Sequence, residues 1–415
     1  MNPPASTAPP AHDGVSTEPR FTGLLAEANA LQPKTVALRR HLHKHPEQGL
    51  QLPHTQAAII KTLDGLPMTV STGDAITSVI GVLHGARPGP TVLLRGDMDA
   101  LPLTETTGLS YASEVDGTMH ACGHDTHVAM LASAARVLCD RRDALAGSVV
   151  FMFQPGEEGH HGARYMIEEG VLEASGQPTT RAYALHITAS ADSGTVRYRS
   201  GSIMAAADQF VVRVTGRGGH GAMPHNAHDP VPAAAEMVGA LQAMLTRRVS
   251  VFDPGVLSVT RISAGTTSNI IPETAELEGT MRALSEQTRE LLRTELVTVC
   301  EHVGAAHGCQ VRVEFLSGYP VTTNDPDAAA RVAALADGVL GSRYAEEMAD
   351  PLMGAEDFSY VLQRVPGALS FLGACPPGID PAEAAPNHSN RVCFDESAFA
   401  HGVAMYAAFA LDALR

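Results

Sequence analysis

Apolar residues recur at helical spacing in some stretches of the chain and form short continuous runs in others. Helical patterns begin at Phe21 and at Asp125, the second continuing to Arg142. The runs at 148–153 and 182–187 are almost entirely apolar, which predicts buried strands. Two further short strands are expected at 78–83 and 91–95. This mixture of helices and buried strands is typical of an α/β domain.

The pattern changes at about Ser200, where polar and apolar residues begin to alternate, as in Phe210, Val212 and Val214. The next elements are expected to be a helix, two strands, a helix and a strand, at 229–248, 255–263, 273–282, 286–307 and 309–315. Together with the alternating strand, this β-α-β-β-α-β order matches the ferredoxin-like pattern. We therefore expect an inserted domain at 200–316.

The α/β pattern resumes after the insert, with a helix at 328–340, a strand at 368–372 and a last helix at 396–414. The first domain is therefore expected to be discontinuous, built from 21–199 and 317–415. Residues 1–20 are rich in Pro, Ala, Ser and Thr and carry almost no large apolar side chain. Such a segment cannot offset the entropy of ordering, so we expect a flexible tail.

Composition narrows the classes of partner. The 415 residues exceed what one core usually organises, and the formal net charge of -16 argues against nucleic acid or an anionic membrane. A small molecule is the expected partner. No apolar stretch approaches about twenty residues, and no signal-like N-terminus is present, so a cytoplasmic enzyme is expected. The six cysteines lack paired spacing and are interpreted as reduced thiols.

Two segments concentrate possible metal ligands. Residues 119–127 read Met-His-Ala-Cys-Gly-His-Asp-Thr-His, and 154–159 read Gln-Pro-Gly-Glu-Glu-Gly. One core histidine is usually only a satisfied polar group, but a thiol and three imidazoles this close suggest a hydrolytic metal centre. Cys122 and His124 are the first candidates for ligands. We expect His120 and His127 to play supporting roles.

The adjacent carboxylates of Glu157 and Glu158 allow two interpretations. A Glu-Glu-Gly sequence is common in solvated turns, but at the end of a buried strand one carboxylate can bind metal while its neighbour transfers a proton. His186 and His388 would each, alone, be ordinary histidines. They become candidate metal ligands because they complete a set large enough for two metals that share a bridging ligand.

Seven motifs carry a resemblance over roughly residues 30–412. These are, besides the Cys-Gly-His and Gly-Glu-Glu segments, the sequences at 40–47, 95–102, 218–225, 268–272 and 354–359. The chain resembles the metal-dependent aminoacylase and carboxypeptidase superfamily. Within it, the similarity is to hippurate hydrolases, auxin-conjugate (IAA-amino acid) amidohydrolases and bacterial N-acyl-amino-acid amidohydrolases. The resemblance implies a catalytic domain with a mixed sheet flanked by helices, and an inserted ferredoxin-like lid and dimerisation domain.

The resemblance also implies roles for the candidate ligands. Cys122 would bridge two divalent metals, with His124 and His186 completing one site, and Glu158 and His388 the other. Manganese, zinc and cobalt all suit such ligands.

Other roles come from the same resemblance. Glu157 would act as the general base and acid, and Asp99 as a supporting carboxylate beside the metals. In the insert, His220 would reach across a homodimer interface to the scissile carbonyl, assisted by Asn269. Arg282 would pair with the substrate carboxylate, and Gly354 would lie at the substrate.

The activity so implied is hydrolysis of the amide bond of an N-acyl amino acid such as an acetyl or benzoyl derivative. A dipeptidase or aminopeptidase on the same scaffold is the alternative within this class. A catalytically silent binding protein is the alternative outside it. The presence of Glu157 and of all five candidate ligands speaks against the silent protein.

Overall fold

The computed structural model describes residues 18–415, which form two compact units. The described part of unit 1 comprises 18–201, 324–349 and 361–415, and unit 2 comprises 202–323 and 350–360. Most of the expected tail, 1–17, lies outside the described residues. Its last residues are ordered, contrary to the prediction: Pro19–Phe21 is a 3₁₀ helix, and the Arg20 carbonyl accepts a 2.6 Å hydrogen bond from Arg141 Nη1.

The two units do not have the domain limits expected from the sequence. Unit 2 continues to Thr323 and also includes Asp350–Tyr360, which was expected in the first domain. Hydrogen bonds explain the second difference, because the Ala205 N–H lies 3.0 Å from the carbonyl oxygens of both Leu352 and Gly354. The functional division into a catalytic domain and a lid stays a prediction.

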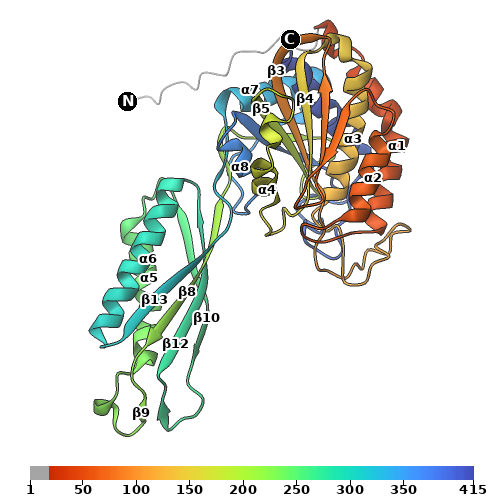
Figure 1. Ribbon diagram of the computed structural model, residues 1–415. Coiled ribbons are helices and arrows are strands. Elements are labelled where there is room, and N and C mark those ends of the chain that lie inside the picture. Colours follow the sequence, from red (N-terminus) through yellow and green to blue (C-terminus); the bar gives the residue numbers. More distant parts are fainter. Residues whose placement is uncertain (1–17) are drawn as a thin grey trace, which may run out of the picture. The chain divides into compact units, whose positions relative to one another are not determined.

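Unit 1 is built on a mixed eight-stranded sheet of order β1-β2-β4-β3-β5-β16-β6-β15 (Figure 1). Its strands are β1 (Thr69–Thr72), β2 (Val79–His84), β3 (Arg87–Asp97), β4 (Ala146–Gln154), β5 (Thr179–Thr188), β6 (Val196–Tyr198), β15 (Ala345–Glu347) and β16 (Gly367–Gly373). The central strands β4, β3, β5 and β16 are parallel to one another. β4, β5 and β16 are almost fully buried, as is β3 from Thr91 onward, which explains their nearly continuous apolar runs.

Helices cover this sheet. They are α1 (Leu24–Lys44), α2 (Pro53–Leu63), α3 (His124–Asp140), α4 (Gly162–Glu168), α7 (Pro326–Leu335) and α9 (Phe399–Ala413). α3 and α9 pack against the central strands, and α1 packs on both of these helices. The expected helix at 328–340 is divided, because α7 continues as a π-helical turn, Ala336–Leu340. The layered α/β architecture predicted from the sequence is thus present.

The carboxyl ends of β3, β4 and β5 meet at one edge of this sheet. Asp97, the last residue of β3, pairs in register with Gln154, the last residue of β4. His186 lies near the end of the neighbouring strand β5. Sites in open α/β sheets gather at this edge. The segments with the candidate ligands follow from these strand ends or lead into α3.

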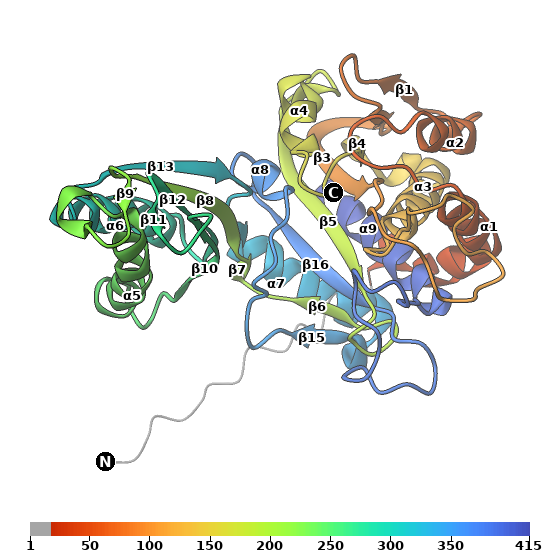
Figure 2. The same ribbon diagram turned by 90° about the horizontal axis from the view of Figure 1, so that it is seen from below.

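Unit 2 contains a four-stranded antiparallel sheet of order β10-β12-β8-β13 with two helices on it (Figure 2). Its elements are β8 (Ala206–Thr215), α5 (Pro230–Arg248), β10 (Gly255–Ala264), β12 (Thr274–Ala283), α6 (Glu286–Ala306) and β13 (Gln310–Ser317). Phe210, Val212 and Val214 are buried beneath the helices, as their alternation predicted. The observed order is the expected β-α-β-β-α-β.

Short elements complete the chain. β9 (Gly219–His220) pairs with β11 (Ile270–Ile271), β7 (Gly201–Met204) pairs with β14 (Thr322–Asn324), and α8 (Ser359–Leu362) is a single turn. None of the helices within residues 18–415 has the length and apolar character needed to cross a membrane. All six cysteines are free thiols.

Candidate metal centre

The Cys122 segment turns sharply as it enters α3. Gly123, the residue before the helix, has a φ of +88°, and a Cβ there would lie 2.4 Å from Ile187 Cγ2. Only glycine adopts this conformation without strain while leaving that space to Ile187. The turn lets Cys122 and His124 approach the same point from adjacent positions. Both side chains are buried.

Cys122 is the common member of two groups of ligand atoms. One group contains Cys122, His124 and His186, the other Cys122, Glu158 and His388, and within each group the ligand atoms lie within 4.8 Å of one another. Cys122 Sγ is 3.4 Å from His186 Nε2 and 3.2 Å from His388 Nε2. His388 Nε2 is also 3.2 Å from Glu158 Oε1. The structure therefore brings together all five residues predicted as ligands.

The surroundings of His124 fit a cation. Its imidazole is fully buried, and within the described chain neither ring nitrogen makes a hydrogen bond of normal geometry, although Asp97 Oδ2 and Asp99 Oδ1 each lie 3.4 Å from one of them. Burial of polar nitrogens without partners is costly, and a metal ion would satisfy them. Burial lowers the pKa of His124, but the charges of Asp97 and Cys122 outweigh it and raise that pKa well above its usual value. The Asp97 carboxylate in particular stabilises positive charge at this position.

His186 and His388 are also prepared for metal binding. His186 Nδ1 donates a 2.7 Å hydrogen bond to the Ile187 carbonyl, which leaves the Nε2 lone pair facing Cys122. Burial lowers the pKa of His186, so the neutral, ligating form is favoured. For His388, hydrogen bonding to Cys122 and Glu158 raises the pKa to about 10. A metal would have to displace that proton.

Asp99 fixes the loop that carries both glutamates. Its Oδ1 accepts the backbone N–H of Glu157 at 3.0 Å, and its Oδ2 accepts that of Glu158 at 2.9 Å. Asp99 Oδ1 also lies 3.4 Å from His124 Nδ1. The Glu157 side chain is only 8% exposed, and its Oε2 is 4.0 Å from His124 Nε2. Glu157 thus borders the ligand groups without belonging to either group that contains Cys122.

The surroundings of His127 are those of a structural residue and not those of a metal ligand. Its Nδ1 donates a 2.5 Å hydrogen bond to Asp97 Oδ1, and its Nε2 accepts one of 2.7 Å from the Ile187 N–H. Both nitrogens are therefore used. Burial raises the pKa of Asp97, but Arg95 and the histidines hold that pKa well below its usual range. His120 is also buried, and burial lowers its pKa to about 3.

The candidate residues of unit 2 fall into separate places. His220 in β9 pairs in register with Ile270 in β11, the residue after Asn269, and the Gly221 N–H bonds the Asn269 carbonyl at 2.9 Å. Arg282 lies near the other end of β12, eight residues and about 26 Å along the strand from Thr274, the first residue of that strand. Its guanidinium donates to the Met281 carbonyl at 2.8 Å. Gly354 accepts a backbone hydrogen bond from Ala205.

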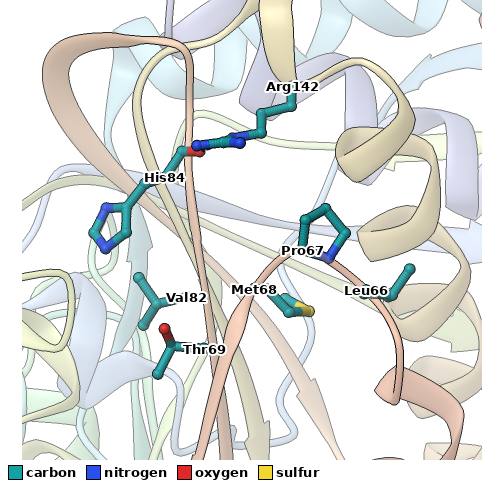
Figure 3. Close-up of a pocket in the computed structure, with 7 residues that line it drawn as sticks. All are labelled: Leu66, Pro67, Met68, Thr69, Val82, His84 and Arg142. Atoms are coloured by element: carbon teal, nitrogen blue, oxygen red, sulfur yellow. Dashed lines mark hydrogen bonds between the residues drawn. The ribbon is translucent and has the colours of Figure 1, made fainter.

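A hollow of about 340 Å³ lies elsewhere in unit 1 (Figure 3). It is lined by Leu66, Pro67, Met68, Thr69, Val82, His84 and Arg142. The Arg142 side chain reaches across it and donates to the His84 carbonyl at 2.7 Å. None of these lining residues is a predicted ligand or catalytic group. The hollow is therefore separate from the metal centre.

Two residues near the ligands received no role from the sequence. Asp97 follows the strand expected at 91–95, and its spacing of two from Asp99 was the available signal. Asn387 precedes His388, and its side chain bonds backbone groups of other segments. Every residue has a backbone carbonyl, so nothing in the sequence indicated which carbonyls Asn387 contacts.

Comparisons with known proteins agree with this geometry. The model of "Peptidase family M20/M25/M40" matches residues 93–412. Thermostable carboxypeptidase 1 of Saccharolobus solfataricus is 37% identical over 380 residues, covering 91% of this chain and 94% of the relative. N-acetyl-L-cysteine deacetylase of Bacillus subtilis is 36% identical over 345 residues, or 83% and 81% of the two chains.

A solved structure extends the likeness to the fold. The Bacillus subtilis YXEP protein, described as a dinuclear metal binding peptidase of the M20 family, matches with a TM-score of 0.80 and 30% identity. The match covers 93% of this chain and 99% of that protein. With the family model spanning most of the sequence, this chain belongs to peptidase family M20/M25/M40, as its motifs predicted.

Proposed function

We propose that this protein is a metal-dependent amidohydrolase that converts N-acyl amino acids to a carboxylic acid and a free amino acid. The observation that carries the proposal is the position of Cys122 Sγ in two groups of ligand atoms, which suits two divalent cations with a shared thiolate. The deacetylase relative is named for an N-acyl amino acid, which supports that substrate class. Manganese, zinc and cobalt are the metals to compare.

The residues of unit 1 suit distinct parts of this reaction. The five ligands would hold two divalent cations, which would supply Lewis-acid chemistry to water and to the amide carbonyl. Glu157 is the base that takes a proton from the attacking water and returns it to the leaving amine. Its burial and its backbone bond to Asp99 favour a fixed carboxylate. Glu158, its neighbour, is a metal ligand and not the base.

We also propose that the protein forms a homodimer. β10 is an edge strand of ten residues, and on it Ile262 is 53% exposed. Long edge strands with exposed apolar side chains are prone to pair with another chain. His220 is exposed beside Asn269, which suits side chains that serve the site of the partner protomer. They would hold the developing oxyanion. Arg282, Gly354 and the cytoplasmic location stay predictions.

A peptidase activity is the second candidate, because one relative is named a carboxypeptidase. The test uses metal-free protein reloaded separately with Mn²⁺, Zn²⁺ and Co²⁺. Each form is assayed for release of free amine from N-acetyl amino acids, N-benzoyl amino acids and unblocked dipeptides. Bound metal per chain is measured by elemental analysis in the same samples.

The proposal expects two metals per chain and a higher kcat/KM for the N-acyl amino acids than for the dipeptides. The reverse preference would favour the peptidase. A folded protein that takes up no metal would contradict both activities and favour a silent binding protein.

A further inference from the structure

Asn387 connects three segments that meet at the candidate metal centre. Its Nδ2 group donates 3.0 Å hydrogen bonds to the carbonyl oxygens of both Cys122 and Ile187. Its Oδ1 accepts a 3.2 Å hydrogen bond from the Ala189 N–H. Both donor hydrogens and the acceptor of the amide are therefore used. The side chain joins the Cys122 turn, the end of β5 and the loop that carries His388.

The bond to Ile187 affects the adjacent ligand. The Ile187 carbonyl accepts from His186 Nδ1 as well as from Asn387. The first of these bonds determines which nitrogen of His186 is free for metal, and the second holds the carbonyl in place. The Ile187 N–H is held in turn by His127. Ile187, the residue after His186, is thus held at both its N–H and its carbonyl, and Asn387 provides one of the bonds to the carbonyl.

His388 needs this support more than the other ligands do. It has a φ of +68°, a left-handed conformation that residues with a Cβ seldom adopt. Its N–H bonds the Ala121 carbonyl at 2.9 Å, next to the carbonyl that Asn387 holds. Its side chain is 56% exposed, so little packing fixes it. Hydrogen bonds from 387 and 388 to the Cys122 turn therefore set its position.

We propose that Asn387 is a positioning residue that fixes the relative geometry of Cys122, His186 and His388. This inference rests on the proposed function, since it assumes that these side chains bind metal. Groups that orient ligands usually contribute to metal affinity without touching the metal. Asn387 does so through three backbone groups, and the residue itself lies outside the ligand set.

The test is a Co²⁺ titration of metal-free wild-type protein and of Asn387→Ala, followed by the thiolate-to-cobalt absorption band. We expect the wild type to bind two equivalents. Of the two Co²⁺ ions, the more weakly bound one should have an affinity for the variant about 10- to 100-fold lower than for the wild type. This is the usual effect of losing a group that orients a ligand. Asn390→Ala is the matched control, because the Asn390 contribution is its backbone carbonyl, bonded to the Thr106 N–H at 2.8 Å.

The melting temperature of each metal-free protein separates positioning from general stability. If Asn387 only stabilises the fold, Asn387→Ala will melt earlier but will bind Co²⁺ like the wild type at temperatures where it is folded. That outcome overturns the inference. If this variant does not fold, Asn387→Asp replaces it, since it keeps the shape and the acceptor for Ala189.

The aspartate variant loses both donors but adds a negative charge, which alone would strengthen cation binding. Equal or weaker Co²⁺ binding by Asn387→Asp therefore supports positioning, and tighter binding contradicts it. A wild type that binds no Co²⁺ would contradict the proposed function instead. A wild type that binds two equivalents, beside a folded Asn387→Ala variant that does the same with equal affinity, contradicts only the inference about Asn387.

Discussion

Asp99 holds Glu157 by its backbone, with the carboxylate Oδ1 3.0 Å from the Glu157 nitrogen. The other oxygen of the same carboxylate accepts the next N–H, that of Glu158. One side chain thus orients two glutamates that are proposed to do different work, proton transfer and metal binding. A small shift of this loop would disturb both, since catalytic groups must be held close to their productive geometry.

The first prediction concerns this carboxylate. Asp99→Asn keeps the size of the side chain but turns one amide NH₂ toward a backbone N–H, so one of the two bonds is lost. We expect both metal affinity and kcat to fall, each by about tenfold or more. Metal titration and steady-state kinetics measure the two effects. Asp140→Asn, an exposed change at the end of α3, should alter neither.

The adjacent glutamates allow a contrast between two isosteric variants. Glu157→Gln removes the proposed base but no ligand, so we expect kcat to fall by about 10²- to 10⁴-fold with full metal content. Glu158→Gln should instead reduce metal content, because this carboxylate lies in the group with Cys122 and His388. Substantial turnover by Glu157→Gln would refute its role. Elemental analysis beside the assay distinguishes the two variants.

Long elements of the fold were predictable because their local signals agree with their tertiary environment. The helix expected at 229–248 is observed as Pro230–Arg248: the Asp229 side chain caps it by accepting from the Val231 N–H, and Pro230 starts it. β9 and β11 were not predicted. Each has two residues, too few for periodicity, and exists because its partner is brought alongside.

The candidate site shows the same division between local and distant information. Cys122 and His124 stand out because a thiol and several imidazoles are concentrated in one short segment. The roles of His186 and His388 came from the family resemblance, since their own surroundings carry little signal. Asn387 could not be assigned, because its partners Ile187 and Cys122 lie 200 and 265 residues away and contribute only backbone oxygens.

The shared thiolate leads to a third prediction. Cys122→Ser replaces a soft sulfur ligand by a hydroxyl that remains protonated near neutral pH, so binding of both metals should weaken. Cys139→Ser is a matched control, a buried thiol at the other end of α3, about 22 Å along the helix. Elemental analysis after dialysis compares them. Equal metal content in the two variants would argue against a bridging Cys122.

A fourth prediction concerns the stability of unit 2 in acid. Asp208 is buried, and Arg289 contacts both of its oxygens, at 2.7 and 2.8 Å. Burial raises the pKa of Asp208, but the bonds and charge of Arg289 outweigh this and hold that pKa below its usual value of 3.8. The unfolded chain then takes up this proton more readily. The contribution to stability is therefore present above pH 3.8 and is lost as the pH falls toward the lower, folded-state pKa.

Asp208→Asn should lower the free energy of unfolding of unit 2 by about 2–3 kcal/mol near neutral pH, because Arg289 then keeps only its ion pair with the exposed Glu286. It should also flatten the loss of stability below pH 3.8. Calorimetry across this pH range measures both effects. Glu276→Gln, which breaks exposed pairs with Arg213 and Arg261, is the control and should change the free energy of unfolding little near neutral pH. An unchanged acid slope in Asp208→Asn would contradict the assignment.

The last prediction tests whether His220 acts across a dimer. His220→Ala and Glu157→Gln should each be nearly inactive alone, because each homodimer lacks one group in both sites. Mixed dimers differ: the protomer with an intact Glu157 would receive an intact His220 from its partner. With random assembly, half the dimers are mixed and each has one complete site, so activity should return to about a quarter of the wild-type level. If His220 served the site of its own protomer, mixing would restore nothing, since no protomer would carry both groups.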